Sequence, residues 1–157
     1  MYCKELSYFF SRSTISLIGF PGSGKSTVGR KVAQERKVPF FDTDHLLEKR
    51  YHLHVRNVWY LLGEKEFRLQ EKACVLALQP GVQVIATGGG VGLCEESSAH
   101  LRRLGEVIYL KVRFSVVYER LQKRGLPAWA RGVTMETVFE ERSLLYERHA
   151  TQVIDYE

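Results

Sequence analysis

The chain has 157 residues, of which 45% are hydrophobic and 26% are charged, and its formal net charge is +5 at pH 7. This length and composition are typical of one soluble globular domain, and no apolar run approaches the roughly 20 residues that cross a bilayer, which argues against a membrane protein. The basic surplus is interleaved with Glu and Asp and lacks an aromatic stacking pattern, which argues against nucleic-acid binding and suits an enzyme with polyanionic ligands.

Strands and helices are predicted to alternate along the chain. Apolar and β-branched runs predict five strands, at about residues 14–20, 38–42, 82–87, 106–112 and 151–155. Helical periodicity covers about residues 25–36, 43–51, 64–79 and 95–104, a stretch up to about 123, and 134–150. We therefore expect a three-layer α/β/α fold with a five-stranded parallel sheet covered on both faces, spanning residues 1–157 as a single domain.

Two stretches do not fit this alternation. Residues 1–13 lack the apolar segment of a secretion signal and predict a short N-terminal extension. Residues 124–133 contain two glycines and a proline and predict a loop, which is bracketed by Arg124 and Arg142. Arginines at both ends of a mobile loop are typical of a lid that supplies positive charge to a transferring phosphoryl group when it closes.

The cysteines and histidines predict neither a disulfide framework nor a metal centre. Cys3, Cys74 and Cys94 form no CxxC pair, and an odd number of cysteines favours a reducing, cytoplasmic location. His52 and His54 form an HxH pair without further ligands at zinc spacing, so we expect solvent-exposed histidines there.

The stretch GFPGSGKST, residues 19–27, matches the phosphate-loop pattern GxxxxGK[ST] between a predicted strand and a predicted helix. In such a loop the backbone N–H groups and the start of the helix surround the phosphates. We expect Lys25 to contact the β- and γ-phosphates of ATP and Ser26 to offer its hydroxyl to Mg²⁺. The predicted nucleotide-binding residues are Gly22, Ser23, Gly24, Lys25, Ser26 and Thr27.

Two carboxylates, Asp42 and Asp44, follow the second predicted strand in the stretch FFDTD. Ligands of open α/β sheets gather at the carboxyl ends of the strands, so both side chains are expected to face the phosphate loop. Asp42 is a candidate for holding Mg²⁺, and Asp44 is a candidate for accepting a proton from an incoming hydroxyl. The alternative is that one of them only caps the helix that begins near Thr43.

A second glycine-rich loop, TGGGV at residues 87–91, follows the third predicted strand. Glycine is used where the backbone needs a positive φ or where another group must approach it closely. Arg68 lies in GEKEFR, where its other interpretation is an ordinary helical ion pair with Glu64 or Glu71.

Taken together, these blocks resemble the shikimate kinase family. GxPGSGKSTVGRKVA, FDTD, GEKEFR and TGGGV occur in that family's order and spacing, and RSLLYER at residues 142–148 is similar to its late R-x-P-L-Y block. The resemblance runs from about residue 14 to residue 155. It implies Mg·ATP-dependent phosphorylation of the 3-hydroxyl of shikimate to shikimate 3-phosphate, a step of aromatic amino acid (chorismate) biosynthesis, by a protein that we expect to be monomeric.

The resemblance also implies a role for each candidate residue. Gly88, Gly89 and Gly90 would form a floor whose N–H groups meet shikimate, and Asp44 would hold its hydroxyls. Arg68 and Arg142 would bind its carboxylate. Trp59 and Phe67 would form the apolar wall of the pocket, and Glu71 would hold Arg68 in place. Arg124 would move in with the lid to the transferring phosphate, and Arg120 would stack on adenine.

Three departures from the family pattern affect these expectations. The lid begins RGLP at residues 124–127 where the family has R-P-L, so Arg131 is a rival to Arg124 as the lid arginine, and Leu144 stands where proline is usual. The family continues beyond the fifth strand into a helix that helps to enclose adenine, whereas this sequence stops at Glu157. We therefore expect either a partly open adenine site or an incomplete chain.

The rival functions are two other kinds of kinase and one function of a different class, a nucleotide-driven switch. A related small-molecule kinase, such as one acting on gluconate, would also use arginines for a carboxylate; nucleoside monophosphate kinases would need a longer inserted acceptor domain. A nucleotide-driven switch that binds a protein partner usually has an apolar strand ending in Asp for Mg²⁺, and here the strand at 82–87 ends in Thr87.

Overall fold

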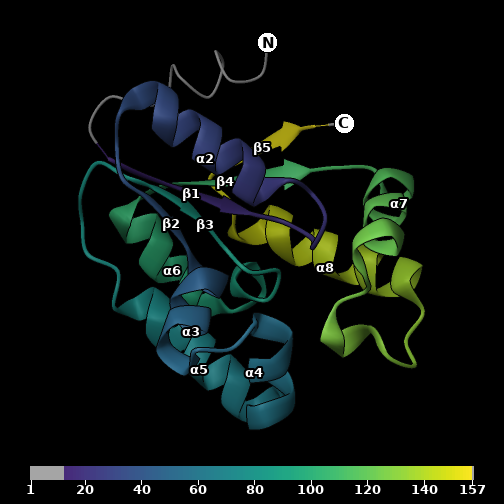
Figure 1. The fold of residues 1–157 in the computed structure, drawn as a ribbon. Helices are drawn as coiled ribbons and strands as arrows, with labels where there is room; N and C mark the ends of the chain where they lie inside the picture. The colour runs from purple at the N-terminus through teal and green to yellow at the C-terminus, as the bar shows by residue number, and fades with distance from the viewer. Residues whose placement is uncertain (1–12, 157) are drawn as a thin grey trace.

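The structure is a computed structural model that describes residues 13–156, so the predicted N-terminal extension lies almost entirely outside the described residues. Strands and helices alternate through the described part (Figure 1). The strands are β1 (Thr14–Ile18), β2 (Phe40–Asp42), β3 (Val84–Ala86), β4 (Gly105–Lys111) and β5 (Gln152–Asp155). The helices are α2 (Lys25–Arg36), α3 (Thr43–Tyr51), α4 (Val55–Leu62), α5 (Glu64–Leu76), α6 (Glu95–Leu104), α7 (Phe114–Arg124) and α8 (Met135–His149), with short 3-10 turns η1 (Val91–Leu93) and η2 (Ala128–Ala130).

The five strands form one sheet in the order β2-β3-β1-β4-β5, and every neighbouring pair is parallel. The central strand β1 is paired on both sides, with Ile15 opposite Val84 of β3 and Glu106 of β4. The predicted five-stranded parallel sheet is therefore confirmed. Because all strands run the same way, the segments that follow β1, β2 and β3 meet at one edge of the sheet.

Alternating side chains place two apolar layers on the two faces of the sheet. Ile15, Leu17 and Val84 pack with the apolar residues of α2 on one face. Ile18 and Ile85 face the larger core that α5, α6 and α8 complete on the other. Helices thus cover both faces, as predicted from the continuous apolar runs of the strands.

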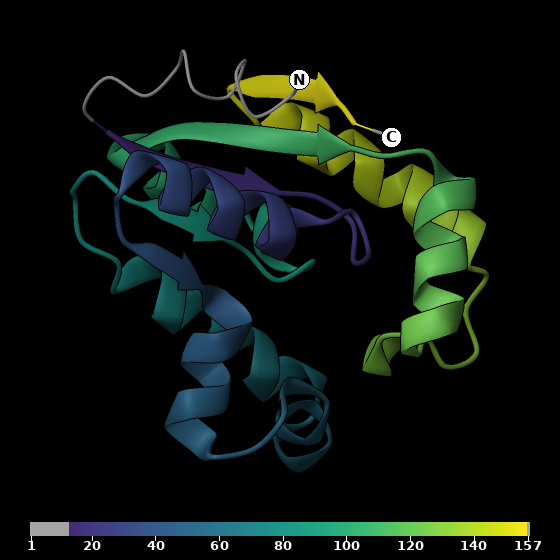
Figure 2. The same ribbon diagram turned by 45° about the horizontal axis from the view of Figure 1, so that its top comes forward.

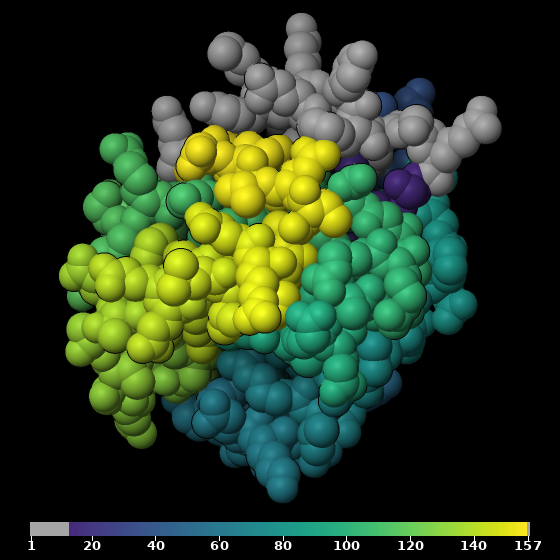
Figure 3. Space-filling view, turned by 180° about the vertical axis from the view of Figure 1, so that it is seen from behind, coloured from purple at the N-terminus to yellow at the C-terminus, as the bar shows by residue number. Residues whose placement is uncertain are grey.

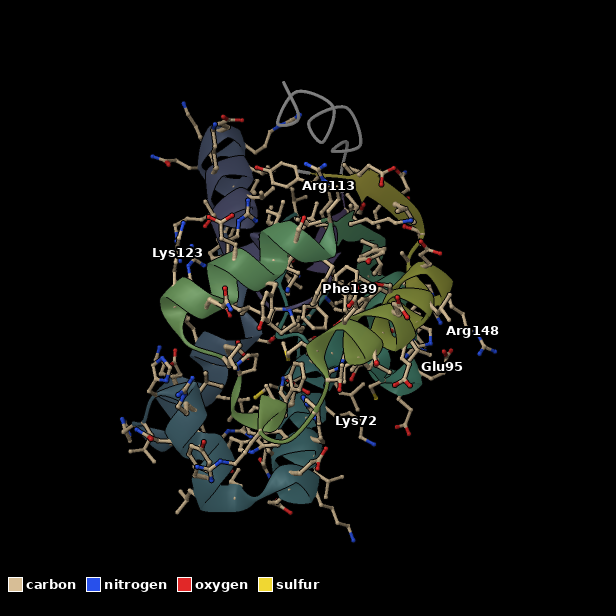
Figure 4. All side chains as sticks on the ribbon, turned by 90° about the vertical axis from the view of Figure 1, so that its right-hand side faces the viewer. Lys72, Glu95, Arg113, Lys123, Phe139 and Arg148 are labelled. Carbon is tan, nitrogen blue, oxygen red and sulfur yellow. The ribbon has the colours of Figure 1, made fainter. Side chains whose placement is uncertain are left out.

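Helix α7 stands beyond the carboxyl end of β4, next to the phosphate loop (Figure 2). Phe139 of α8 connects this helix to the core, because its ring lies 5.3 Å from that of Phe114 and 5.1 Å from that of Phe20. In Figure 4 Phe139 lies between α7 and α8, whereas the charged Lys123 and Arg148 extend outward. The lid segment between α7 and α8 is thus attached to packed helices at both ends.

Viewed from behind, α8 and β5 lie beside α6 (Figure 3). A hydrogen bond connects α6 and α8, since Arg102 Nη1 donates to the carbonyl oxygen of His149 at 3.0 Å.

Within residues 13–156, no helix is both long enough and apolar enough to cross a membrane.

The sequence-based prediction missed α4. This helix has eight residues, its first turn is capped by the His54 side chain, and Gly63, with φ 78°, ends it. Its apolar residues do recur at helical spacing, with Val58 and Trp59 on the packed side, but its eight residues are fewer than the roughly 11 over which periodicity is usually recognised, and Tyr60 and Leu61 are 59% and 63% exposed. Its importance is positional, because it places Arg56 and Trp59 at the edge of the candidate site.

Candidate active site

The phosphate loop connects β1 to α2 and has the backbone shape that its glycines permit. Gly22 and Gly24 have φ angles of 83° and 90°, which are costly for residues with a side chain. The buried Lys25 ammonium lies against the loop and donates to the carbonyl oxygens of Gly19 at 2.8 Å and Phe20 at 3.0 Å. Burial lowers the pKa of Lys25 to about 8, although Asp44 and Asp42 oppose the change.

Asp42, the last residue of β2, caps α3, which is one of the two alternatives that the sequence left open, and its second oxygen contacts the phosphate loop. Its Oδ1 accepts hydrogen bonds from the backbone N–H groups of Asp44 at 3.0 Å and His45 at 3.4 Å, which caps α3. Its Oδ2 accepts a hydrogen bond from the Ser26 hydroxyl at 2.6 Å. A carboxylate and a hydroxyl beside the phosphate loop form a donor set that suits a hard cation such as Mg²⁺.

Asp44 lies in the first turn of α3 and lines the same cavity as Lys25. Its pKa is raised to about 7, first by burial and then by the charges of Asp42 and Glu71, while Lys25 opposes the change. A carboxyl group with a pKa near neutrality can both hold and accept a proton at physiological pH.

The three residues of the triplet after β3 are glycines because neighbouring atoms leave no room for a Cβ atom. None of Gly88, Gly89 and Gly90 has a positive φ. A Cβ atom on Gly88 would lie 2.5 Å from Asp44 Oδ1, and one on Gly89 would lie 2.7 Å from the ring of Pro21. A Cβ on Gly90 would overlap the Arg68 guanidinium. The triplet is therefore a surface against which side chains of the site pack.

Hydrogen bonds hold the triplet loop in place from two sides. The fully buried Thr43 accepts from the N–H of Gly88 through its hydroxyl oxygen at 2.8 Å. The hydroxyl of Tyr146, on α8, donates to the carbonyl oxygen of Gly89 at 2.6 Å. The N–H of Gly88 is thus engaged inside the protein. Of the three amides expected to meet an acceptor, those of Gly89 and Gly90 have no bond within residues 13–156.

The two candidate carboxylate-binding arginines come from different helices. Arg68, on α5, forms an ion pair with the buried Glu71 at 3.0 Å, and its guanidinium lies 5.1 Å from the ring of Trp59. Burial raises the pKa of Glu71, and the charges of Arg68 and Arg142 oppose this rise. Arg142, on α8, stacks on Trp129 of the lid with its guanidinium carbon 3.8 Å from the ring centre. The structure therefore supports the Glu71 alternative for Arg68, in addition to any role in binding.

The other candidate arginines differ in position. Arg124, at the end of α7, lines the cavity, whereas Arg131 lies after η2, is exposed and does not line it. Arg120 donates to the carbonyl oxygen of Gly22 at 3.1 Å and so lies against the phosphate loop. A residue that the sequence did not single out, Arg56 of α4, donates through Nη2 to the carbonyl oxygen of Leu126 in the lid.

These elements enclose one cavity of about 330 Å³. Its walls are the phosphate loop, the first turn of α3, parts of α4 and α5, the glycine triplet and the lid from Arg124 to Trp129. Sequence reasoning missed four contributors, namely Thr43, Arg56, Trp129 and Tyr146. Thr43 was detectable because it stands between the two aspartates of FDTD, whereas Arg56, Trp129 and Tyr146 act through contacts between different elements that no local pattern marks.

Comparison with known proteins agrees with this arrangement. The sequence model of one family, described as shikimate kinase, matches residues 21–157. The chain belongs to the shikimate kinase family. Among curated relatives, shikimate kinase of Rhizobium meliloti is 37% identical over 114 residues, covering 72% of this chain and 59% of that protein. Shikimate kinase of Staphylococcus aureus is 36% identical over 110 residues, covering 70% and 63%. The chain thus spans about three fifths of the length of the curated relatives it matches.

Solved structures of the same family share the fold. Shikimate kinase from Acinetobacter baumannii in complex with shikimate has a TM-score of 0.83 at 26% identity, covering 96% of this chain and 87% of that one. Shikimate kinase from Aquifex aeolicus has a TM-score of 0.77 at 33% identity, covering 90% and 86%. The P-loop kinase fold expected from the sequence is therefore confirmed for this family member.

Proposed function

We propose that the protein transfers the γ-phosphoryl group of ATP to the 3-hydroxyl of shikimate, forming shikimate 3-phosphate for aromatic amino acid biosynthesis. One observation carries the proposal. Asp44 packs on Gly88 and Arg68 packs on Gly90, so a carboxylate and a guanidinium converge over one glycine surface inside the cavity that the phosphate loop opens into. The relative from Acinetobacter baumannii, whose structure holds shikimate, supports this choice of acceptor.

The acceptor's carboxylate is assigned to Arg68 and Arg142. Both guanidinium groups are planar forks that can bind a carboxylate through two parallel N–H groups. Glu71 fixes the orientation of Arg68 through their 3.0 Å ion pair. Trp59 and Phe67, whose rings are 5.1 Å apart, supply an apolar wall against the acceptor ring. Gly89 and Gly90 are the triplet residues whose amides can meet its polar groups.

The nucleotide is assigned to residues 22–27, with Arg120 and Arg124 at the α7 side. Ser26 and Asp42 would hold Mg²⁺, which when bound neutralises charge on the β- and γ-phosphates. Lys25 would then exchange the carbonyl oxygens of Gly19 and Phe20 for phosphate oxygens. Arg124 is preferred over Arg131 as the lid arginine, because Arg124 lines the cavity.

Asp44 would orient the attacking hydroxyl and accept its proton. Phosphoryl transfer proceeds through a loose transition state, so positioning contributes more than strong base catalysis. A pKa of about 7 keeps a substantial fraction of Asp44 ionised at neutral pH, and Lys25 nearby favours the ionised form. The hydroxyl proton would pass to an Asp44 Oδ as the oxygen attacks the γ-phosphorus.

The proposed function is tested by ADP release in a coupled assay with ATP, Mg²⁺ and either shikimate or gluconate. We expect saturable ADP release with shikimate and background release with gluconate or without an acceptor. Mass spectrometry should find one added phosphoryl group on shikimate. Turnover of gluconate in preference to shikimate, or ADP release that ignores both acceptors, would reject the assignment.

A further inference from the structure

The chain contains two tryptophans, and each lies against one of the two candidate carboxylate-binding arginines. Trp59 belongs to α4 and therefore accompanies Arg68 within one group of helices. Trp129 instead belongs to η2 in the lid, 13 positions before Arg142 in sequence. The Arg142 guanidinium carbon is 3.8 Å from the Trp129 ring centre, compared with 5.1 Å for Arg68 and Trp59. The closer stack is thus the one made by the lid.

This stack uses a face of the guanidinium and leaves its edge for hydrogen bonds. Arg142 Nη1 is buried and has no hydrogen-bond partner within residues 13–156. Burial and the charge of Arg68 lower the pKa of Arg142, whereas a hydrogen bond with the Tyr146 side chain and the charge of Glu71 oppose the change. A half-buried cation that is stacked on one face and has a buried Nη1 without an acceptor among the described residues is suited to capture an anion in the guanidinium plane.

The ring of Trp129 is itself held in place. It makes an edge contact with Phe20, with ring centres 5.9 Å apart, and Phe20 directly precedes the phosphate-loop turn. Three residues earlier in the lid, the carbonyl oxygen of Leu126 accepts a hydrogen bond from Arg56 of α4. The lid is therefore attached to α4 on the acceptor side and, through Trp129, to the residue proposed to bind the acceptor's carboxylate.

We propose that Trp129 is a specificity-determining positioning residue that completes the acceptor-carboxylate site from the lid. The inference rests on the proposed function and adds to it. Stacking fixes the Arg142 plane and excludes water from one face, so the N–H edge presents a preformed fork to the carboxylate. Closing of the lid is then coupled to binding of the carboxylate. The position of the lid therefore depends on the acceptor as well as on the nucleotide.

The first test is steady-state kinetics of Trp129→Ala and Trp129→Phe. We expect Trp129→Ala to raise KM for shikimate about tenfold, with KM for ATP within twofold of the wild-type value, and Trp129→Phe to recover most of the loss because a smaller ring still stacks. Tyr60→Ala is the matched control, because Tyr60 is an exposed aromatic residue of α4 outside the cavity. Equal increases in both KM values for Trp129→Ala would indicate a purely structural role and overturn the inference.

A second measurement uses the carboxamide analogue of shikimate, which lacks the negative charge. If Trp129 acts through Arg142 on the carboxylate, Trp129→Ala should weaken turnover of shikimate but leave the poorer turnover of the carboxamide nearly unchanged. A loss of the same size with both acceptors would overturn the inference even if the protein is well folded.

Intrinsic fluorescence gives a readout that needs no turnover. Trp59→Phe keeps an aromatic ring in the acceptor wall, and its shikimate-dependent ADP release is measured first to show that it still binds the acceptor. In this variant the remaining tryptophan, Trp129, reports on the Arg142 stack, and its emission should change saturably with shikimate without nucleotide. Arg56→Ala in that background should weaken the response, whereas Arg50→Ala, which removes an exposed arginine bonded to Gln70, should not. If Trp59→Phe phosphorylates shikimate but its emission does not change with shikimate, the role of Trp129 is rejected and the proposed function still stands. Failure of the proposed function is recognised separately, because the wild-type protein would then lack shikimate-dependent ADP release.

Discussion

The two glycine-rich loops at the carboxyl edge of the sheet have similar sequences but use glycine for different reasons. In the phosphate loop Gly22 and Gly24 adopt positive φ angles, and a Cβ on Gly24 would have room, with its nearest neighbour 3.7 Å away. In the triplet the φ angles are ordinary, and a Cβ on Gly88 or Gly90 would strike Asp44 or Arg68. The first loop needs glycine because its backbone has positive φ angles, and the second needs glycine because neighbouring side chains occupy the place of a Cβ atom.

This difference separates the two halves of the proposed reaction. A loop with inward-turned N–H groups is suited to phosphate, which the backbone binds together with the side chains of Lys25 and Ser26. A bare surface that carries a carboxylate and a guanidinium is suited to a small molecule with hydroxyl and carboxylate groups. Substitutions in or beside the triplet should therefore weaken binding or turnover of the acceptor, and substitutions in the phosphate loop should weaken binding of ATP.

The largest expected effect is that of Asp44→Asn, which removes the carboxylate packed on Gly88. We expect kcat to fall by about 10²–10³-fold, because the attacking hydroxyl loses its orienting proton acceptor. Affinity for ATP, measured by titration without acceptor, should stay within about twofold. A comparable loss of ATP affinity would mean that Asp44 belongs to the nucleotide half and that the separation is wrong.

The second prediction concerns Gly90→Ala, whose Cβ would overlap the Arg68 guanidinium. Arg68 would have to leave the position in which it pairs with Glu71, so KM for shikimate should rise about 10–100-fold with little change in ATP affinity. Such a range corresponds to about 1.4–2.8 kcal/mol of lost acceptor binding. Steady-state kinetics with each substrate varied in turn measures both values.

Gly81→Ala is the control for this substitution. A Cβ on Gly81 would have no neighbouring atom within 4 Å, and its φ is not positive, so neither KM should change. If Gly90→Ala behaved like Gly81→Ala, close packing would not be the reason for the triplet.

The third prediction concerns Gly24→Ala, where space is available but φ is 90°. This region costs a residue with a side chain about 1–2 kcal/mol, so we expect a Tm lower by several degrees and ATP affinity lower by about tenfold. The Kd for shikimate without nucleotide should be unaffected. Thermal unfolding and separate titrations with ATP and shikimate measure these changes, and a selective loss of shikimate binding would contradict the comparison.

The last prediction concerns stability, which should depend on pH because of Asp44. Its pKa is raised from 3.8 to about 7, so between these values the folded protein holds a proton that the unfolded chain releases. The stability from this group is therefore present at low pH and lost as pH rises through about 7. The opposing charge of Lys25 is already included in this pKa value, and at about 1.4 kcal/mol per pKa unit we expect roughly 2–3 kcal/mol between pH 5 and pH 8, or about 4–12 °C in Tm.

Thermal unfolding of wild type and Asp44→Asn at pH 5 and pH 8 measures this effect. The variant should gain in Tm relative to wild type on going from pH 5 to pH 8, because asparagine carries no charge at either pH. A Tm difference that is the same at both pH values would show that Asp44 titrates outside this range.

Much of the site was predictable because its residues are adjacent in sequence to the ends of strands. The phosphate loop, Asp42 with Asp44, and the triplet each follow an apolar run, and parallel strands bring such segments to one edge. Helix α4 was missed because it has only eight residues, which is short for recognising a helical period even though its apolar residues follow one. The sequence also left open whether Asp42 caps a helix or holds Mg²⁺; the structure shows the cap on one oxygen and adds a hydrogen bond from Ser26 on the other, which no sequence pattern indicated.

The amino-acid sequence by itself determined the order of the strands and helices, the parallel sheet and the loop that shapes a phosphate site, because these follow from local periodicity and from glycine's backbone freedom. Tertiary structure alone decided why the triplet is bare, which carboxylate faces which glycine, and that Trp129 of the lid stacks on Arg142. Those facts depend on contacts between segments far apart in the chain, such as the hydrogen bond between Thr43 and Gly88, which are 45 positions apart. No local sequence pattern predicts such a contact, because the contact depends on how whole helices pack on the sheet.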